Sequence, residues 1–349
     1  MANIMLTSVC NLHCPYCFAN EYVHRDSAEI SADRFLKAKE FILGDGTERG
    51  IGLIGGEPTT HSRFEELLCL TIEDPRARIV SVYTNAVFLD RFFHLVSHPK
   101  VRMLVNCNSP SDMGTSAFMR MRDNLDEMIL RRLARDRITL GINLYKPGFE
   151  YGFILELLKR YQYNHVRISV AVPNMADRRD CDPRDNFTAF LPGLRLFLKE
   201  LILEGIVPSF DCNKIPKCVF SKEDLDEFAR VAGAAYEKRK LRKKISISGK
   251  VNCSPVVDIT QDLIAVRCFG LSEYTKVPIS RFACISDLKQ YYLRTVDAFA
   301  CNTVFSHDCA DCYERLAGHC YGGCLAYKIH AIRQMQDASS LLMENPGAV

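Results

Sequence analysis

Cys10-Asn11-Leu12-His13-Cys14-Pro15-Tyr16-Cys17 is a C-x3-C-x2-C run near the start of the chain. Three thiolates on one short loop can hold three irons of a cubane 4Fe-4S cluster and leave the fourth iron without a protein ligand. Structural zinc is the alternative, but it takes four protein ligands, and the next cysteine after this run is Cys69. The run therefore indicates an iron-sulfur site with one open iron.

The composition is that of an ordinary globular protein, with 48% hydrophobic and 25% charged residues among 349. No apolar stretch is long enough to cross a bilayer, and the N-terminus lacks the basic and apolar regions of a signal peptide. We therefore expect a cytoplasmic protein without a membrane partner, in which sixteen cysteines favour metal binding over disulfides. The net charge of +3 does not indicate nucleic-acid binding, and the basic run 238–244 is typical of a solvated helix end.

Short aliphatic runs alternate with amphipathic stretches up to about residue 206, which predicts βα units around a parallel sheet. The predicted strands are 3–7, 50–54, 78–83, 101–106, 137–144 and 165–172. The predicted helices lie near 31–43, 62–73, 88–96, 116–135, 150–161 and 187–204. Six such units make a partial (β/α)6 TIM-like barrel, an α/β fold. Beyond residue 206 the βα rhythm stops, and a small cysteine-rich C-terminal cluster-binding domain is expected.

Gly55-Gly56-Glu57-Pro58 follows the second predicted strand, at the end of a barrel where the loops converge. Beside the three-cysteine loop, this stretch resembles the GGEP motif of the radical S-adenosylmethionine (radical SAM) superfamily. The resemblance implies that Cys10, Cys14 and Cys17 hold a 4Fe-4S cluster whose open iron chelates S-adenosylmethionine. It also implies that Gly55, Gly56, Glu57 and Pro58 hold the amino group of that cofactor, and it places Tyr16 at the family's aromatic position.

Segments of three further strands resemble cofactor-binding segments of the family. The first two of them depart from the family's residues. The third strand ends in a TNG-like element in which Ala86 replaces glycine. Asn106 and Asn108 end the fourth strand, where relatives carry an acidic residue near the ribose, so they keep hydrogen-bonding capacity without the carboxylate. Gly141 lies inside the fifth strand, where glycine is unfavourable unless something approaches closely, and the family places an adenine contact there.

The later cysteines form two groups of four: Cys212, Cys218, Cys253 and Cys268, followed by Cys309, Cys312, Cys320 and Cys324. Eight thiolates satisfy two four-ligand cubanes. Their arrangement resembles the SPASM domain, a C-terminal extension of radical SAM enzymes that carries auxiliary 4Fe-4S clusters. Structural zinc, which also uses two cysteine pairs per metal, fits the C-terminal set taken alone about as well.

The chain departs from the SPASM pattern in spacing, because seven residues instead of five precede the third late cysteine and no cysteine follows Cys324. In the expected hairpin, Leu263 stands where glycine is usual. Two wirings remain open. Each group of four can hold its own cluster, or Cys324 can join Cys253 and Cys268 while Cys301 completes a site with the other three late cysteines.

We therefore expect a radical SAM barrel over 1–206 and a SPASM-like auxiliary cluster domain with a C-terminal helix over 207–349. The resemblance implies reductive cleavage of S-adenosylmethionine to a 5'-deoxyadenosyl radical that abstracts a substrate hydrogen. SPASM members mostly modify ribosomally made peptides or protein side chains, which favours an oxidative or crosslinking peptide maturase. An electron donor such as flavodoxin or ferredoxin is expected. Against a peptide maturase stands the start of the barrel at residue 3, which leaves no room for the N-terminal leader-peptide binder that many maturases carry. A maturase of this kind would use a separate leader-peptide-binding protein.

Two alternatives stay open. One is a radical SAM dehydrogenase of a small molecule, as in relatives with a shortened extension. The other is a non-catalytic iron-sulfur or zinc protein that binds nucleic acid through 238–244, which Glu57 and Tyr16 disfavour because a scaffold needs no cofactor site. No acidic residue can be singled out in the sequence for proton removal.

Overall fold

The computed structural model describes residues 1–23, 27–130, 135–171, 183–211, 213–240, 244–245, 251–303 and 307–329. The strands are β1 (Ala2–Met5), β2 (Gly50–Ile54), β3 (Ile79–Thr84), β4 (Val101–Asn106), β5 (Ile138–Leu144), β6 (His165–Val170), β7 (Val207–Phe210), β8 (Asp258–Ile259), β9 (Ile264–Val266) and β10 (Val277–Pro278). The helices of the barrel part are α1 (Ala32–Leu43), α2 (Phe64–Ile72), α3 (Phe93–Val96), α4 (Pro110–Met113), α5 (Thr115–Leu130), α6 (Gly152–Tyr161), α7 (Pro183–Leu203) and α8 (Lys222–Arg239). The later helices are α9 (Ser272–Thr275), α10 (Ile285–Tyr292), α11 (Ala298–Asn302), α12 (His307–Ala310) and α13 (Tyr313–Leu316).

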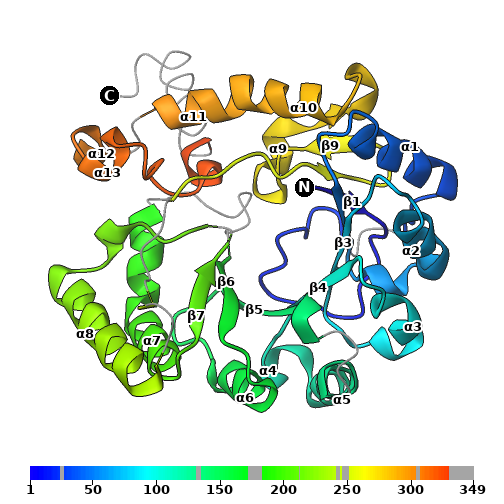
Figure 1. Cartoon of the computed structure of the whole chain (residues 1–349). Coiled ribbons are helices and arrows are strands. Elements are labelled where there is room, and N and C mark those ends of the chain that lie inside the picture. The colour runs from blue at the N-terminus through cyan, green and yellow to red at the C-terminus, as the bar shows by residue number, and fades with distance from the viewer. Residues whose placement is uncertain are drawn as a thin grey trace, which may run out of the picture.

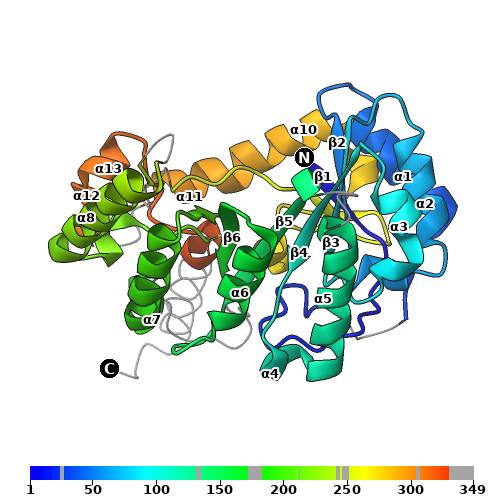
Figure 2. The ribbon, with the colours of Figure 1, turned by 60° about the horizontal axis from the view of Figure 1, so that its bottom comes forward.

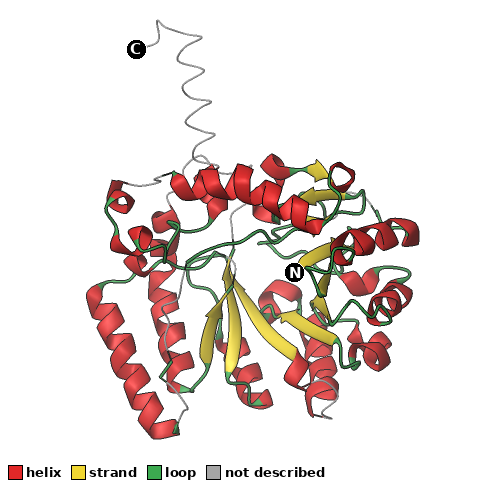
Figure 3. Ribbon diagram, turned by 45° about the horizontal axis from the view of Figure 1, so that its top comes forward, coloured by secondary structure: helices red, strands yellow, loops and turns green. Residues whose placement is uncertain are grey.

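The strands form one curved sheet in the order β10-β9-β8-β1-β2-β3-β4-β5-β6-β7, with helices on its outer side (Figures 1 and 3). Strands β1 to β7 are all parallel to their neighbours, as βα units require. The α/β class and the six predicted strands are confirmed.

The expected end of the βα rhythm at residue 206 is wrong for the sheet. Strand β7 pairs in parallel with β6, from Val207 opposite His165 to Phe210 opposite Ile168. Helix α8 follows and packs beside α7 (Figures 1 and 2). The parallel sheet therefore continues beyond the proposed domain boundary. The division of the chain there stays a prediction. Residues 325–329 are helical, and the part of the predicted C-terminal helix beyond them lies outside the described residues.

The C-terminal segment also joins the sheet, through the β8–β9 hairpin that the sequence predicts. Strand β8 pairs in parallel with β1, with Asp258 opposite Asn3. In the hairpin turn Leu263 has a φ of +62°. This left-handed conformation favours glycine, which explains why a glycine is usual there. The cysteine-rich segment is thus connected to the first strand of the barrel.

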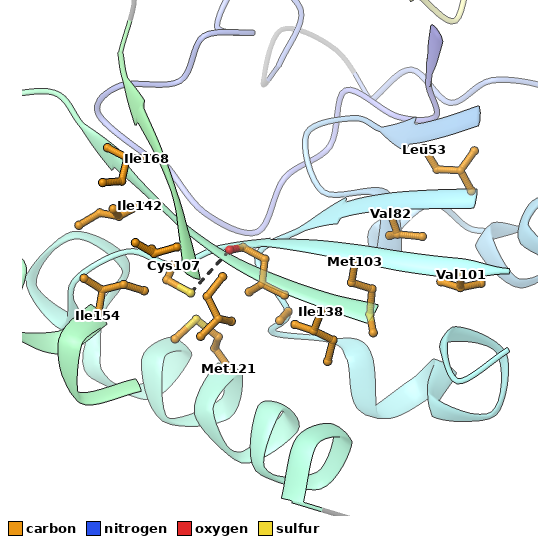
Figure 4. Close-up of a cluster of buried hydrophobic side chains, with 14 of the residues drawn as sticks. Leu53, Val82, Val101, Met103, Cys107, Met121, Ile138, Ile142, Ile154 and Ile168 are labelled. Carbon is orange, nitrogen blue, oxygen red and sulfur yellow. Dashed lines mark hydrogen bonds between the residues drawn. The ribbon is translucent and has the colours of Figure 1, made fainter. Parts of the chain in front are cut away.

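The core lies between the strands and the outer helices, where Met103 of β4 and Met121 of α5 belong to one buried cluster (Figure 4). Cys107 is fully buried there, and its thiol donates to the Val105 carbonyl at 3.6 Å. We expect no ligand role for this cysteine, because a buried free thiol packs as a small hydrophobe. None of the helices within the described ranges is both long and apolar enough to span a bilayer.

Candidate active site

The three-cysteine loop leaves the carboxyl end of β1 and lies inside the curve of the strands (Figure 1, dark blue). Backbone N–H of Leu12 donates to Cys10 Sγ at 3.5 Å, and Asn108 Nδ2 donates to Cys14 Sγ at 3.2 Å. Burial, with smaller contributions from the nearby Glu57, Cys14 and Cys17, raises the pKa of Cys10 to about 12. Thiols held together in this way ionise when a metal takes up their charge, so the loop suits an iron-sulfur cluster.

Gly55 and Gly56 lie directly against the cluster loop. The N–H of Gly56 donates to the Thr7 carbonyl at 2.8 Å. A Cβ atom on Gly56 would lie 2.3 Å from the Val9 carbonyl oxygen and 2.9 Å from Cys10 Cβ. The two glycines are therefore needed for the close approach of two backbone segments. This contact sets the position of the first cluster cysteine, and contact of these glycines with the cofactor stays a prediction.

Glu57 is 1% exposed, and both of its carboxylate oxygens accept hydrogen bonds within the chain. Oε1 accepts from Thr84 Oγ1 at 2.7 Å and from both the hydroxyl and the N–H of Thr59, at 2.6 and 3.2 Å. Oε2 accepts from the N–H of Asn85 at 2.7 Å. Pro58 starts the short helical turn that carries Thr59. The carboxylate thus joins the GGEP-like loop to the end of β3, in addition to its predicted contact with the amino group of the cofactor.

The backbone conformation of the TNG-like element explains why glycine is usual at its third position. Ala86 has a φ of +61°, the left-handed conformation in which glycine is usual. Asn85 Nδ2 donates to Asn11 Oδ1 at 2.8 Å, which joins the end of β3 to the cluster loop. Both GGEP-like and TNG-like segments therefore hold the cysteine loop in place.

Tyr16 lies beside two asparagines at the ends of β4 and β5. Its hydroxyl donates to Asn108 Oδ1 and accepts from Asn143 Nδ2 at 3.3 Å. Its ring centroid is 5.2 Å from that of Tyr145. Burial raises the pKa of Tyr16, so the phenol stays neutral at physiological pH. Through Asn108, which also donates to Cys14, the structure brings these predicted site residues together.

Arg167 is an interior residue that the sequence analysis does not single out. Its register partners are Gly141 on β5 and Ser209 on β7. Its guanidinium contacts Asn106 Oδ1 at 3.5 Å and Asn143 Oδ1 at 2.9 Å. A Cβ atom on Gly141 would lie 3.0 Å from Arg167 Cδ, so this glycine makes room for the arginine. The predicted ribose and adenine contacts of Asn106 and Gly141 stay predictions.

Asp258 is a buried acid on the same inner wall, with 3% exposure. The neighbouring Ile4 and Ile259 pack into the core against the helices, so alternation points Asn3 and Asp258 to the opposite, inner face. Asn3 Nδ2 donates to Asp258 Oδ1 at 2.7 Å. Burial raises the pKa of Asp258 to about 7. A short, two-residue strand gave no sequence signal for it.

The late cysteines divide between two places. Cys253, Cys268 and Cys324 line a cavity of about 200 Å³. Cys218, by contrast, is exposed and is not among the lining residues, and Cys212 lies outside the described residues.

Cys309, Cys312 and Cys320 lie in and around the short helices α12 and α13. Cys312 directly precedes α13, and the N–H of Gly322 donates to Cys320 Sγ at 3.2 Å. Among the described residues, no three His, Cys, Asp or Glu side chains are arranged to hold a single metal ion. Both the auxiliary clusters and their wiring stay predictions.

An open parallel barrel with a three-cysteine loop at the carboxyl end of its first strand defines the fold class of this protein. Residues 4–139 match the radical SAM superfamily. The chain therefore contains a radical SAM domain. The cofactors of the domain are a 4Fe-4S cluster and S-adenosylmethionine, which the residues around Cys10, Cys14 and Cys17 suit.

A GTP 3',8-cyclase of Klebsiella pneumoniae subsp. pneumoniae is 32% identical over 91 residues, which cover 25% of this chain. The chain spans about a quarter of the length of the curated relatives it matches, 27% for this one. Native anSMEcpe with bound AdoMet has a similar fold, with a TM-score of 0.61 and 14% identity over 98% of both chains. Streptococcus suis SuiB bound to precursor peptide SuiA has a TM-score of 0.57 and 15% identity over 93% of this chain and 71% of that one.

Proposed function

We propose that this chain is a radical SAM enzyme that oxidises or crosslinks a ribosomally made peptide or a protein side chain. The observation that carries the proposal is the cavity lined by Cys253, Cys268 and Cys324. Three thiols around a space of this size suit an auxiliary iron-sulfur cluster. Such a cluster would accept the electron that the substrate loses when it is oxidised.

The chain's own residues would prepare the site in three ways. Cys10, Cys14 and Cys17 would hold the site cluster, and the GGEP-like loop would keep their loop against β1. Asn108 and Tyr16 would orient Cys14 and close one side of the site. Arg167 and its asparagine partners would give the inner wall polar groups for a substrate or cofactor, and the buried setting would exclude water from the radical.

The peptide substrate is supported by likeness of fold. SuiB, whose structure contains a bound precursor peptide, shares the fold over 93% of this chain. A small-molecule substrate is the second candidate, because GTP 3',8-cyclase is similar over a quarter of the chain. The expected electron donor, flavodoxin or ferredoxin, and a separate leader-peptide-binding protein belong to the peptide proposal.

Deuterium transfer can test the substrate class before the substrate itself is identified. Cells of the source organism would be grown in heavy water, and their extract divided into peptide and small-metabolite fractions. Each fraction would be incubated anaerobically with reconstituted enzyme, unlabelled S-adenosylmethionine and dithionite. We expect deuterium in 5'-deoxyadenosine only with the peptide fraction, and we expect its loss after protease treatment of that fraction.

Transfer from the small-metabolite fraction alone would contradict the peptide proposal and support the second candidate. A chain with alanine at Cys10, Cys14 and Cys17 is the matched control. It should form no 5'-deoxyadenosine with either fraction. Any deuterated 5'-deoxyadenosine formed with this variant would show that the product does not depend on the site cluster.

A further inference from the structure

Arg267 is the largest fully buried side chain among the described residues, with 1% exposure. It lies directly after β9 and directly before Cys268. Burial of a guanidinium costs several kcal/mol unless the charge is paired and its N–H groups are hydrogen-bonded. The partners of Arg267 therefore indicate what it does.

One partner is Asp297, which is 4% exposed and ends the π-helical turn between α10 and α11. Nε of Arg267 donates to Asp297 Oδ2 at 3.0 Å, and Nη2 donates to Oδ1. This bidentate pair balances the two buried charges and fixes the orientation of the guanidinium plane. The π-helical turn places Asp297 at the position that this pair requires.

The third guanidinium nitrogen, Nη1, points to a cysteine. Nη1 of Arg267 donates to Cys253 Sγ at 3.1 Å. A neutral thiol is a weak acceptor, whereas a thiolate accepts a charge-assisted hydrogen bond. Arg267 also lines the cavity that it shares with Cys253, Cys268 and Cys324. The arrangement thus places a positive, oriented donor beside a thiol that faces a cysteine-lined space.

We propose that Arg267, oriented by Asp297, positions the Cys253 thiolate as a ligand of an auxiliary cluster and raises the reduction potential of that cluster. Hydrogen bonds to ligand sulfurs and nearby positive charge stabilise the reduced, more negative cluster. The cluster thereby becomes a better acceptor for the electron that a substrate loses. This inference rests on the proposed function, because it requires a cluster in this cavity.

The test is a redox titration of the anaerobically reconstituted full-length chain, followed by electron paramagnetic resonance. The main variant combines Arg267→Met with Asp297→Leu, which removes both buried charges together and so avoids an unpaired one. Arg267→Lys keeps the charge without the fork. Arg34→Met is the matched control, because Arg34 pairs with Asp262 at 2.9 Å on the exposed side of the same hairpin.

We expect the double variant to shift the potential of one auxiliary cluster to more negative values. Arg267→Lys should give a smaller shift, and the control should give none. The site cluster should keep its potential in every variant. Selective loss of about four irons from a folded double variant, relative to the control, would also support the positioning role.

Full iron content with unchanged potentials in the double variant would overturn the role of Arg267. A different result would overturn the proposed function first. If the unaltered chain holds about four irons and zinc in its C-terminal segment, no auxiliary cluster exists for Arg267 to position. Iron and zinc analysis of the unaltered chain therefore separates the two failures.

Discussion

Replacement of Asp258 by asparagine should remove a pH dependence from the stability of the folded chain. Burial raises the pKa of this carboxyl from its ordinary 3.8 to about 7. Hydrogen bonds from Asn3 and the Phe269 backbone, and the charge of Arg267, oppose the rise without cancelling it. No ion pair joins Asp258 to a lysine or arginine in the described part of the chain. The folded chain therefore keeps a proton that the unfolded chain has released.

The direction in which pH changes the free energy of unfolding follows from proton release. Between pH 3.8 and about 7 unfolding releases the Asp258 proton, so a rise in pH favours the unfolded state. The contribution of the protonated carboxyl is fully present below the unfolded pKa and is lost as the pH approaches 7. One pKa unit corresponds to about 1.4 kcal/mol, so the free energy of unfolding falls by about 4 kcal/mol across the whole window. Between pH 5 and pH 8 the fall is about 3 kcal/mol.

Urea titrations of the reconstituted chain under argon, followed by circular dichroism, would measure this effect at pH 5, 6, 7 and 8. The Asp258→Asn variant keeps an oxygen that accepts from Asn3 but cannot ionise. The difference in free energy of unfolding between this variant and the unaltered chain should therefore rise by about 3 kcal/mol, in favour of the variant, from pH 5 to pH 8.

Asp262→Asn is the control on the same hairpin, because the Asp262 side chain is 77% exposed. It should follow the pH curve of the unaltered chain. The reasoning would be refuted by parallel stability curves for Asp258→Asn and the unaltered chain.

Three further variants test the site and the late cysteines. Alanine at Cys10, Cys14 and Cys17 should abolish formation of 5'-deoxyadenosine, measured by chromatography, while the C-terminal metal content stays unchanged; retained cleavage would contradict the site. Glu57→Gln should lower the free energy of unfolding by about 2 kcal/mol in urea, since an amide N–H₂ replaces an oxygen that accepts a buried hydrogen bond. The same variant should weaken S-adenosylmethionine binding in calorimetry, and an unchanged dissociation constant would place the amino group elsewhere. Cys301→Ala should cost about four irons only if the late cysteines are wired across the two groups.

Local patterns were enough to predict the barrel and the placement of the three-cysteine loop after its first strand. Six strands and their helices follow from hydrophobic periodicity, which depends on residues within a few positions of one another. The three-cysteine loop and the GGEP-like loop are also local, since each places its chemistry on a few consecutive residues. Strand β7 was missed because Val207-Pro208-Ser209-Phe210 is short and contains a proline, which a strand tolerates at the edge of a sheet.

Burial and long-range pairing were not available from the sequence. Asn3 and Asp258 are 255 positions apart, and β8, which brings them together, has two residues. Arg167 and Gly141 meet because strands pair in register, and Arg267 reaches both Asp297 and Cys253 because the C-terminal segment folds back on itself. The pKa of Asp258 and the orientation of Arg267 depend on how much water is excluded around them. Solvent exclusion is a property of the whole packed chain, so no short stretch of sequence encodes it.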